Sequence, residues 1–540
     1  MTKGPLLLLA VVVFLLHALL TGGHLTSPDE ELMYRMAEGI ALRGSTQVLP
    51  LEADLATGRL PEGLPPELTF ATRQGRDPGV FYAQYLPLQP LLSVPIVWLA
   101  RATESVLAEP YSRLMWPNSA TTGFEGLSPE DRAAGLWRRG LLVILFNPLV
   151  AALSAVLLCR LATLLTGNRK AGLFAAYAWA FGTIGWAHSK TYFTEPLAGL
   201  LFLAALDHLL RWFRVPLGSG WKHAALAGGF LALANLTRVD GPFFTVGLFG
   251  VAAGAAIWKY LRDESWGRLD RRLPIVDLAL LGGIAFAGWV ALQSFNTIRF
   301  GPDLTSGYGN QVEGVQFTTP LLIGLHGLTM SPGKGLFFFS PALLLGCWGL
   351  WRARHRFRWE IAFVLLGLLP FTLAMVKWQN WDGGWCWGPR HIVQIHLPLM
   401  LGAAFLWNEG RSLIRRTLMW TLLAVGAGVQ IFGTSQASMD YYREFFTTPE
   451  DLTYHQLNIR GVQEAAIQAN FALHFRDSDG SVSREARPGA FPAPLIDSLY
   501  LPQHTQWYSY PLMWQMGYCD WLVWNALRGG ARNPDRWTED

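Results

Sequence analysis

The chain has 540 residues, of which 51% are hydrophobic and only 15% are charged, and its mean hydropathy is +0.24. This composition excludes a soluble multidomain protein, a disordered chain and a coiled coil, and it indicates a membrane protein. The formal net charge of +4 is too small over this length to indicate a nucleic-acid partner. Four cysteines are too few for a disulfide-stapled scaffold.

Stretches apolar enough to cross the roughly 30 Å hydrocarbon core of a bilayer occur about eleven times in the chain. The expected spans are 5–21, 140–165, 171–187, 195–210, 223–237, 243–258, 274–293, 335–351, 359–376, 391–407 and 415–433. The sequence therefore predicts an all-α polytopic membrane protein. A signal peptide is the alternative for the first span, but only Lys3 precedes it and no small-x-small cleavage site follows.

One apolar stretch, residues 84–101, is not counted as a span. It contains Pro87, Pro90 and Pro95, and proline interrupts helices. We interpret it as a re-entrant or interfacial segment on the outer face. If it does cross the membrane, a second crossing must lie within 102–139.

Arginine and lysine gather in five short loops, which predicts the orientation of the chain. These residues are Arg169 and Lys170; Arg211, Arg214 and Lys222; Lys259 to Arg268, Arg271 and Arg272; Arg352, Arg354, Arg356 and Arg358; and Arg411, Arg415 and Arg416. All five loops fall on one side, and cytoplasmic loops carry the excess of positive charge. We therefore expect a transmembrane part over 1–434, whose first outer loop covers 24–139, and an extracytoplasmic C-terminal region over 435–540.

The first outer loop contains three consecutive acids, Asp29, Glu30 and Glu31, directly after Pro28. A partly desolvated carboxylate at the rim of the membrane is a usable base toward a hydroxyl group. For Glu30 and Glu31 the alternative is a helix N-terminus, where acids offset the helix dipole. Asp29 is the first candidate for a catalytic base, because ionisable groups near membrane depth are usually functional.

Four cations on the same outer face, Lys190, Arg238, Lys334 and Arg390, stand beside apolar spans against the positive-inside tendency. If they converge, they would bind a phosphate group and stabilise the charge that develops on a phosphate leaving group. The alternative for each is that it snorkels to headgroups or pairs with a neighbouring acid such as Glu195 or Asp240.

Several further side chains of the outer loops are candidates for the same site. His391 follows Arg390 and is a candidate phosphate donor or proton shuttle, while Glu195 is either a substrate ligand or a helix acid. The remaining candidate substrate-binding residues are Asp77, Tyr82, Tyr85, Tyr308 and Trp385. No motif for a metal, nucleotide or other cofactor is found, although a divalent metal is left open. Cys386 and Cys519 are both expected outside, where a disulfide is chemically feasible.

Seven outer segments, taken in order, resemble those of a known family. They are SPDEE, YAQYLPLQPLLSVP, FGTIGWAHSKTYFTEPLA, LANLTRVDG, RFGPDLTSGYG, LTMSPGKGLFFFSPALLL and WDGGWCWGPRHIVQIHLPL. Together they resemble the bacterial phospholipid-carrier-dependent glycosyltransferases, which are similar to the protein O-mannosyltransferases and belong to the GT-C superfamily. The resemblance covers residues 1 to about 435, and SKTYFTEP, SPGKGLFFFSP and WCWGPR are its most specific motifs.

The resemblance implies a GT-C-like transmembrane catalytic domain over 1–434, in the plasma (inner) membrane with its site facing outward. It implies inverting transfer of one sugar from a polyprenyl-phosphate donor to a lipid, glycan or protein acceptor of unknown identity. In that family the acidic pair of the first outer loop supplies the base, here Asp29, with Glu30 as a helper or acceptor ligand. A polymerase or ligase of lipid-linked glycans and a transporter of lipid-linked sugars remain as alternatives.

Overall fold

The structure is a computed structural model. It describes residues 3–48, 72–77, 80–115, 128–216, 219–262, 275–302, 317, 319–378, 381, 383, 386–409, 412–436, 475–476, 482–483 and 519–528. Two of the candidate site residues, Tyr308 and Trp385, lie outside these ranges, as does most of the expected C-terminal region 435–540.

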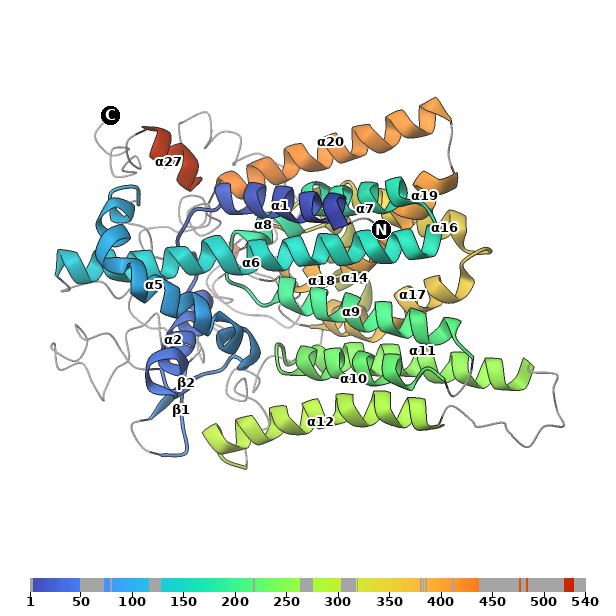
Figure 1. Ribbon diagram of the computed structural model, residues 1–540, viewed down its shortest axis with the longest axis horizontal. Helices are drawn as coiled ribbons and strands as arrows, with labels where there is room; N and C mark the ends of the chain where they lie inside the picture. The colour runs from blue at the N-terminus through green and yellow to red at the C-terminus, as the bar shows by residue number, and fades with distance from the viewer. Residues whose placement is uncertain are drawn as a thin grey trace.

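Long helices run side by side along the long axis of the molecule (Figure 1). They are α1 (Lys3–Leu19), α6 (Pro129–Thr166), α7 (Arg169–Gly182), α9 (Glu195–Arg214), α10 (Trp221–Asn235), α11 (Gly241–Arg262), α12 (Ile275–Phe300), α17 (Arg358–Lys377) and α20 (Leu413–Ser435). Shorter helices between them are α8 (Gly185–Ser189), α14 (Leu321–Met330), α15 (Leu336–Phe339), α16 (Leu343–Ala353), η1 (Arg390–Ile392), α18 (Val393–Leu399) and α19 (Leu401–Glu409). Each of the expected spans coincides with one or more of these helices, so the prediction of an all-α membrane protein is confirmed.

Not every expected span is one continuous helix. Within the described part of the chain, seven helices are each long and apolar enough to cross a membrane. The expected span 335–351 is divided between α15 and α16, because the chain leaves helical geometry at Ser340 before Pro341. The expected span 391–407 is likewise divided among η1, α18 and α19. Such broken helices are tolerated at membrane depth where protein surrounds them.

Helix α6 is longer than a bilayer requires. Its 38 residues correspond to about 57 Å at 1.5 Å per residue, against roughly 30 Å of hydrocarbon. Ser128 caps its N-terminus by accepting a hydrogen bond from the Asp131 amide, and Gly167 ends it in the left-handed conformation with φ 69°. The first turns of α6 therefore project beyond the bundle and support the elements at that end.

The proline-rich segment forms a continuous helix, which corrects the prediction of a helix broken by proline. Helix α5 (Leu88–Ser112) carries Pro95 and Pro110 in its interior. It is also one of the helices long and apolar enough to span a membrane. However, α5 packs on α6 and on α2 (Pro28–Arg43), and Figure 1 shows it crossing the end of the bundle obliquely. The helix is thus not interrupted, and whether it lies at the outer face or crosses the membrane stays a prediction.

The described residues of the five basic loops lie at the opposite end of the molecule from α2 and α5 (Figure 1). Contacts between distant residues hold this end together. Asn168 Nδ2 donates to Asn408 Oδ1 at 3.1 Å, and Arg214 Nη2 lies 3.1 Å from Glu360 Oε1. The sequence predicts that these loops lie on one side of the membrane, and their shared position in the structure agrees with that. Whether this end is cytoplasmic stays a prediction.

The apolar core runs through the bundle along α6, α7, α9, α17 and α19. Two of its helices, α16 and α19, approach each other at glycines. A Cβ added to Gly349 would lie 1.7 Å from the Gly402 carbonyl oxygen, and one added to Gly402 would lie 1.9 Å from the Gly346 carbonyl oxygen. Small residues allow backbones to pack this closely in membrane bundles.

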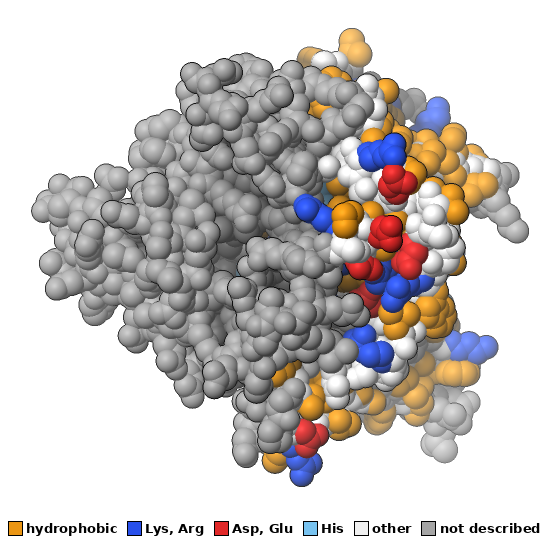
Figure 2. All heavy atoms as spheres, turned by 90° about the vertical axis from the view of Figure 1, so that its left-hand side faces the viewer, with side chains coloured by type: hydrophobic (Ala, Val, Ile, Leu, Met, Phe, Trp, Pro, Cys, Tyr) orange, Lys and Arg blue, Asp and Glu red, His pale blue; other side chains and the backbone are white. Residues whose placement is uncertain are grey.

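The end of the bundle opposite the basic loops carries a β-hairpin and helix α27 (Leu522–Arg528). The antiparallel pair β1 (Thr72–Gln74) and β2 (Phe81–Ala83) places Thr72 opposite Ala83. Helix α27 lies near the ends of α1 and α20 (Figure 1). A second short pair, β3 (Phe475–Arg476) and β4 (Val482–Ser483), belongs to the C-terminal region. Figure 2 faces this end and shows acidic and basic side chains gathered on its described surface.

Candidate active site

Helix α2 begins with the acidic triplet of the first outer loop. Ser27 is its N-cap, and Ser27 and Glu30 form a reciprocal capping box. Pro28 occupies the first helical position, where its missing N–H costs nothing. The start of α2 is therefore fixed by local sequence, and it sets the directions in which the three acids point.

Glu30 is fully buried and serves as a structural acceptor. One carboxylate oxygen accepts from the amides of Thr26 at 2.6 Å and Ser27 at 3.0 Å and from the Thr26 hydroxyl, while the other accepts from the Tyr192 amide at 2.5 Å. Burial raises the pKa of Glu30, although these hydrogen bonds oppose the rise. The structure thus shows the capping role weighed from the sequence and gives Glu30 no open oxygen for the expected acceptor contact.

Asp29 takes part in a chain of alternating charges. Arg390 Nη1 lies 3.3 Å from Asp29 Oδ2, and Arg390 Nε lies 3.7 Å from Glu195 Oε1. The same Glu195 oxygen lies 2.7 Å from Arg238 Nη1, and Arg238 Nη2 lies 2.7 Å from Asp240 Oδ2. Acids and arginines from four separate segments therefore meet at one place. Arg238 thus pairs with both Glu195 and Asp240, the neighbouring acids that the sequence offered as its alternative partners.

Asp29, Arg390 and Arg238 are the more open members of this chain. Their side chains are 17%, 18% and 15% exposed, whereas Glu195 and Asp240 are 3% and 6% exposed. The Arg390 guanidinium also lies over the Phe193 ring, 4.4 Å from its centroid. Burial disfavours the charged form of Arg390, but Glu195 and Asp29 raise its pKa above the ordinary value. The Arg390 guanidinium is thus charged, stacks on the Phe193 ring and is partly exposed to solvent.

Two glycines that precede Arg390 in the chain have left-handed backbone conformations. Gly383 and Gly388 adopt φ values of 80° and 61°, a region that other residues rarely occupy. A Cβ on Gly388 would also meet the Phe339 ring at 2.9 Å. Lys334, which is almost fully buried, supports the segment that precedes Arg390 by donating to the Cys386 carbonyl at 2.8 Å.

His391 lies beside these cations. The charges of Arg390, Arg238 and Lys334 all act on it, and the charge of Glu195 opposes them. Its Nδ1 is buried and has no hydrogen-bond partner among the described residues. Three of the four expected cations thus act on one histidine, which places them in one neighbourhood.

Lys190 is the exception among the expected cations. Its ammonium group donates to the Thr434 carbonyl at 3.0 Å, to the Gln436 carbonyl, and to Asp520 Oδ2 at 3.3 Å. Asp520 also binds His24 Nε2 at 2.6 Å, and these two partners lower its pKa although burial works against them. Lys190 therefore holds the C-terminal segment against the end of the bundle.

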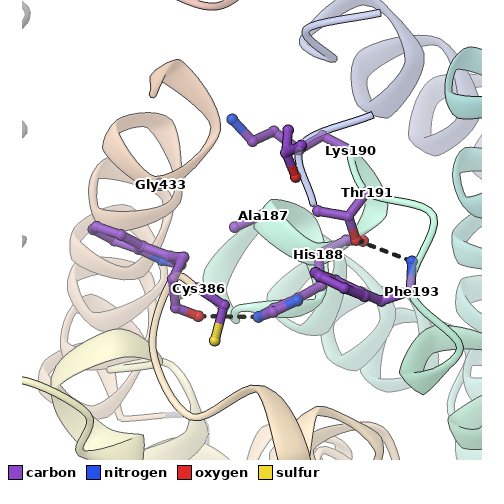
Figure 3. Close-up of a pocket in the computed structure, with 9 residues that line it drawn as sticks. Ala187, His188, Lys190, Thr191, Phe193, Cys386 and Gly433 are labelled. Atoms are coloured by element: carbon purple, nitrogen blue, oxygen red, sulfur yellow. Dashed lines mark hydrogen bonds between the residues drawn. The ribbon is translucent and has the colours of Figure 1, made fainter. Parts of the chain in front are cut away.

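A cavity lies next to the charged chain, between α8, the segment 386–387 and α20 (Figure 3). Thr26 and Phe193 line it and connect it with the start of α2 and with Arg390. His188 lines it as well, with Nε2 3.0 Å from the Trp387 carbonyl oxygen. The described part of the site thus consists of a charged chain at the rim and an adjoining cavity.

The expected substrate-binding residues of the first outer loop divide into two groups. Asp77 is exposed in the turn between β1 and β2, and Tyr82 packs edge-on against Phe300 of α12. These two lie on the hairpin rather than in the charged chain. Tyr85 is close enough to Arg390 to contribute to the raised pKa of the arginine. The structure therefore brings Tyr85 to the site and leaves Asp77 and Tyr82 on the hairpin.

Cys386 and Cys519 are both buried and are not joined by a disulfide, so the bond considered from the sequence is not formed. The Cys386 thiol instead lies 3.3 Å from the Gly383 carbonyl oxygen. Among the described residues, no group of three or more His, Cys, Asp and Glu side chains has the geometry of a metal site.

Sequence reasoning missed the groups that support the site. Glu31 is buried and binds Arg139 of α6 with both carboxylate oxygens, at 2.5 and 2.7 Å, and Arg35 of its own helix at 2.8 Å. The spacing of Glu31 and Arg35 at i and i+4 was a readable signal. The partnership with Arg139 was not, because 108 residues separate the two.

Comparison with known proteins gave likeness in fold only, because no family model and no curated protein matches the sequence. The chain is similar to ArnT from Cupriavidus metallidurans, solved bound to undecaprenyl phosphate, with 14% identity, a TM-score of 0.43, and 86% of this chain and 70% of that chain covered. It is also similar to the oligosaccharyltransferase of Archaeoglobus fulgidus in the apo form, with 12% identity and a TM-score of 0.44. The match covers 84% of this chain and 60% of that chain. A further structure is AglB of the same organism with an inhibitory peptide and a dolichol-phosphate, at 14% identity and a TM-score of 0.41, with coverage of 84% and 60%. The chain thus spans about three fifths of the two archaeal chains.

Proposed function

We propose that the chain is an inverting glycosyltransferase that moves one sugar from a polyprenyl-phosphate donor to an acceptor hydroxyl at the outer face of the membrane. The observation that carries this proposal is the contact between Asp29 and Arg390, in which a carboxylate and a guanidinium are both partly open to solvent. A base for the acceptor and a cation for the departing phosphate are the two groups that a single displacement needs. The resemblance of the outer-loop motifs supports the donor class.

In the proposed reaction, Asp29 removes the proton from the acceptor hydroxyl. The acceptor oxygen forms a bond to the anomeric carbon of the sugar from the face opposite the phosphate. The bond between that carbon and the phosphate oxygen breaks, and its electron pair stays on the lipid phosphate. The proton then passes from Asp29 to solvent, so the carboxylate is restored.

Arg390 is suited to the phosphate because its present partner is weakly held. A single 3.3 Å contact joins it to Asp29, whereas the buried pair of Glu31 and Arg139 has two contacts at 2.5 and 2.7 Å. A phosphate group can offer Arg390 a bidentate contact, which would leave the Asp29 carboxylate free for the acceptor. Glu195 would hold the arginine side chains in place during this exchange.

The remaining members of the proposed phosphate site are Arg238, Lys334 and His391. Arg238 and Lys334 contribute positive charge around His391, and charge fixed before the reaction stabilises a leaving group without reorganisation. We leave Lys190 out of this site, because its ammonium group binds the end of α20 and Asp520 rather than the segment that precedes Arg390.

Asp29→Asn in the purified full chain tests the proposal. The expected result is that transfer from radiolabelled polyprenyl-phosphate hexoses and pentoses, with envelope extract of a deletion strain as acceptor, falls at least about a hundredfold. Binding of unglycosylated polyprenyl phosphate should persist. Glu109→Gln, at an exposed carboxylate of α5, is the control and should keep full activity.

Three outcomes would contradict the proposal in different ways. Unchanged transfer in Asp29→Asn would remove Asp29 from the mechanism. Transfer from diphosphate-linked glycan alone would indicate the polymerase or ligase class. Movement of lipid-linked sugar across vesicles without a covalent product would indicate a transporter.

A further inference from the structure

The cavity beside the charged chain is small. Its volume is about 20 Å³, which is room for a group such as a hydroxyl and not for a whole sugar ring. Phe193 and Trp387 supply aromatic walls, while Ala187 and Gly433 leave space. A Cβ on Gly433 would lie 2.5 Å from the Trp387 ring, so this wall is closely packed. Figure 3 shows His188 between Phe193 and Cys386 at the centre of the lining.

His188 presents a hydrogen-bond acceptor that has no protein partner. Burial lowers its pKa to about 4, so the ring is neutral at pH 7. Because Nε2 faces the Trp387 carbonyl oxygen at 3.0 Å, Nε2 carries the hydrogen and Nδ1 keeps its lone pair. Nδ1 is buried and has no partner among the described residues. A buried acceptor without a partner costs free energy, which a ligand hydroxyl would recover.

Two threonine hydroxyls on the lining have already used their hydrogens. The Thr26 hydroxyl donates to Glu30 at 2.9 Å, and the Thr191 hydroxyl donates to the His188 carbonyl oxygen at 2.8 Å. The Thr26 oxygen therefore acts only as an acceptor toward the cavity, as does the Thr191 oxygen, which already accepts from the Phe193 amide at 3.5 Å. Together with His188 Nδ1, these groups favour a ligand that donates hydrogen bonds.

Lys190, the cation on the lining, does not change this preference for a ligand that donates hydrogen bonds. In Figure 3 the side chain of Lys190 extends away from His188, and its ammonium group donates to the Thr434 and Gln436 carbonyls and to Asp520. An anion would therefore have to break existing bonds to reach Lys190. The charges that act on His188 are of both signs, since Glu195 opposes Arg390 and Lys334, so they favour neither a cationic nor an anionic ligand. A neutral hydroxyl group fits both conditions.

We propose that this cavity is the subsite that recognises a hydroxyl group of the donor sugar, with His188 Nδ1 as its acceptor and His188 as a specificity-determining residue. The inference rests on the proposed function, because it names where the sugar of the polyprenyl-phosphate donor lies. Phe193 joins the two parts of the site, since its ring lines the cavity and lies under the Arg390 guanidinium. A donor with its phosphate at Arg390 thus has its sugar beside His188.

Two substitutions at His188 separate its two ring nitrogens. His188→Gln places an amide N–H where Nε2 stands, so it can keep the contact with Trp387 while Nδ1 is lost. His188→Asn places a carbonyl oxygen where Nδ1 stands, so it keeps the acceptor. His396→Gln is the matched control, because His396 is a buried histidine with Nδ1 near the Ile392 carbonyl oxygen and does not line the cavity.

The probes are unglycosylated polyprenyl phosphate, polyprenyl-phosphate glucose, galactose and mannose, and monodeoxy forms of the sugar that binds best. Affinity is measured by quenching of tryptophan fluorescence. We expect one monodeoxy donor to bind the wild type about tenfold more weakly than its parent, which is the size of one neutral hydrogen bond. This difference should vanish in His188→Gln and persist in His188→Asn and His396→Gln.

Each contrary outcome has a distinct meaning. If His188→Gln binds unglycosylated lipid and still discriminates the same deoxy donor, the cavity is not the sugar subsite. If wild type discriminates none of the deoxy donors, the inference is wrong as well. If unglycosylated polyprenyl phosphate fails to bind the wild type, the proposed function fails first. Should His188→Gln not fold, the same comparison in His188→Asn decides, because loss of discrimination there contradicts an acceptor role for Nδ1.

Discussion

Replacing Glu31 by Gln would test whether the buried ion pair anchors the acidic helix α2 to α6. Glu31 and Arg139 are about 5% and 4% exposed, so removing the carboxylate takes the negative charge of Glu31 away from a buried guanidinium. The pKa of Glu31 falls from the ordinary 4.5 to about 2, because Arg139 and Arg35 outweigh the effect of burial. Each tenfold change in proton affinity is worth about 1.4 kcal/mol, which gives a loss of about 3 kcal/mol. That value agrees with the roughly 3–5 kcal/mol that follows the breaking of a buried pair.

The measurement is the free energy of unfolding of the purified chain in mixed micelles, followed by its tryptophan fluorescence. Glu38→Gln is the matched control, since Glu38 pairs with Arg138 between the same two helices at 2.6 Å but is 21% exposed. We expect it to lose only about 1 kcal/mol, as partly exposed pairs do. Equal losses in Glu31→Gln and Glu38→Gln would refute the reasoning that burial decides the strength of these pairs.

Two further predictions concern pH and the phosphate site. Because the folded pKa of Glu31 is about 2 and its ordinary value is 4.5, its contribution to stability is complete above about pH 5 and is lost as the pH falls toward 2. The difference in unfolding free energy between wild type and Glu31→Gln should therefore shrink below pH 5, and a constant difference down to pH 3 would contradict it. Arg390→Lys keeps the charge but loses the fork geometry, so the Kd for unglycosylated polyprenyl phosphate should rise about tenfold. Unchanged quenching by this lipid would remove Arg390 from the phosphate site.

Much of the bundle could be predicted from the sequence because apolar length is a strong constraint. A stretch that must satisfy its own backbone in hydrocarbon has to be helical, and each expected span indeed coincides with helix. The basic loops share one end because the chain crosses the bundle an even number of times between one basic loop and the next. Pro95 did not break α5, because an interior proline can be accommodated where neighbouring helices pack against the freed backbone groups.

The partners of the outer cations could not be predicted in the same way. Lys190 binds Asp520, which is 330 residues away, and Arg390 contacts Asp29, which is 361 residues away. Residue type and position indicated that the outer cations lie at one face of the membrane. The neighbouring sequence, however, does not distinguish a cation bound to the C-terminal segment, such as Lys190, from one that is open to a substrate, such as Arg390. For Arg238 the nearby Asp240 was readable, because only one residue separates them.

The acidic triplet shows why residue type alone does not define a catalytic group. Successive residues of a helix point about 100° apart, so Asp29, Glu30 and Glu31 enter three different environments. Glu30 is directed back to the N-cap and Glu31 into Arg139, and each has its oxygens occupied by buried donors. Asp29 alone keeps a partly exposed carboxylate, held by one long contact to Arg390. A base must be able to exchange its partner for an acceptor hydroxyl, and of the three only Asp29 can do so without unfolding the start of α2.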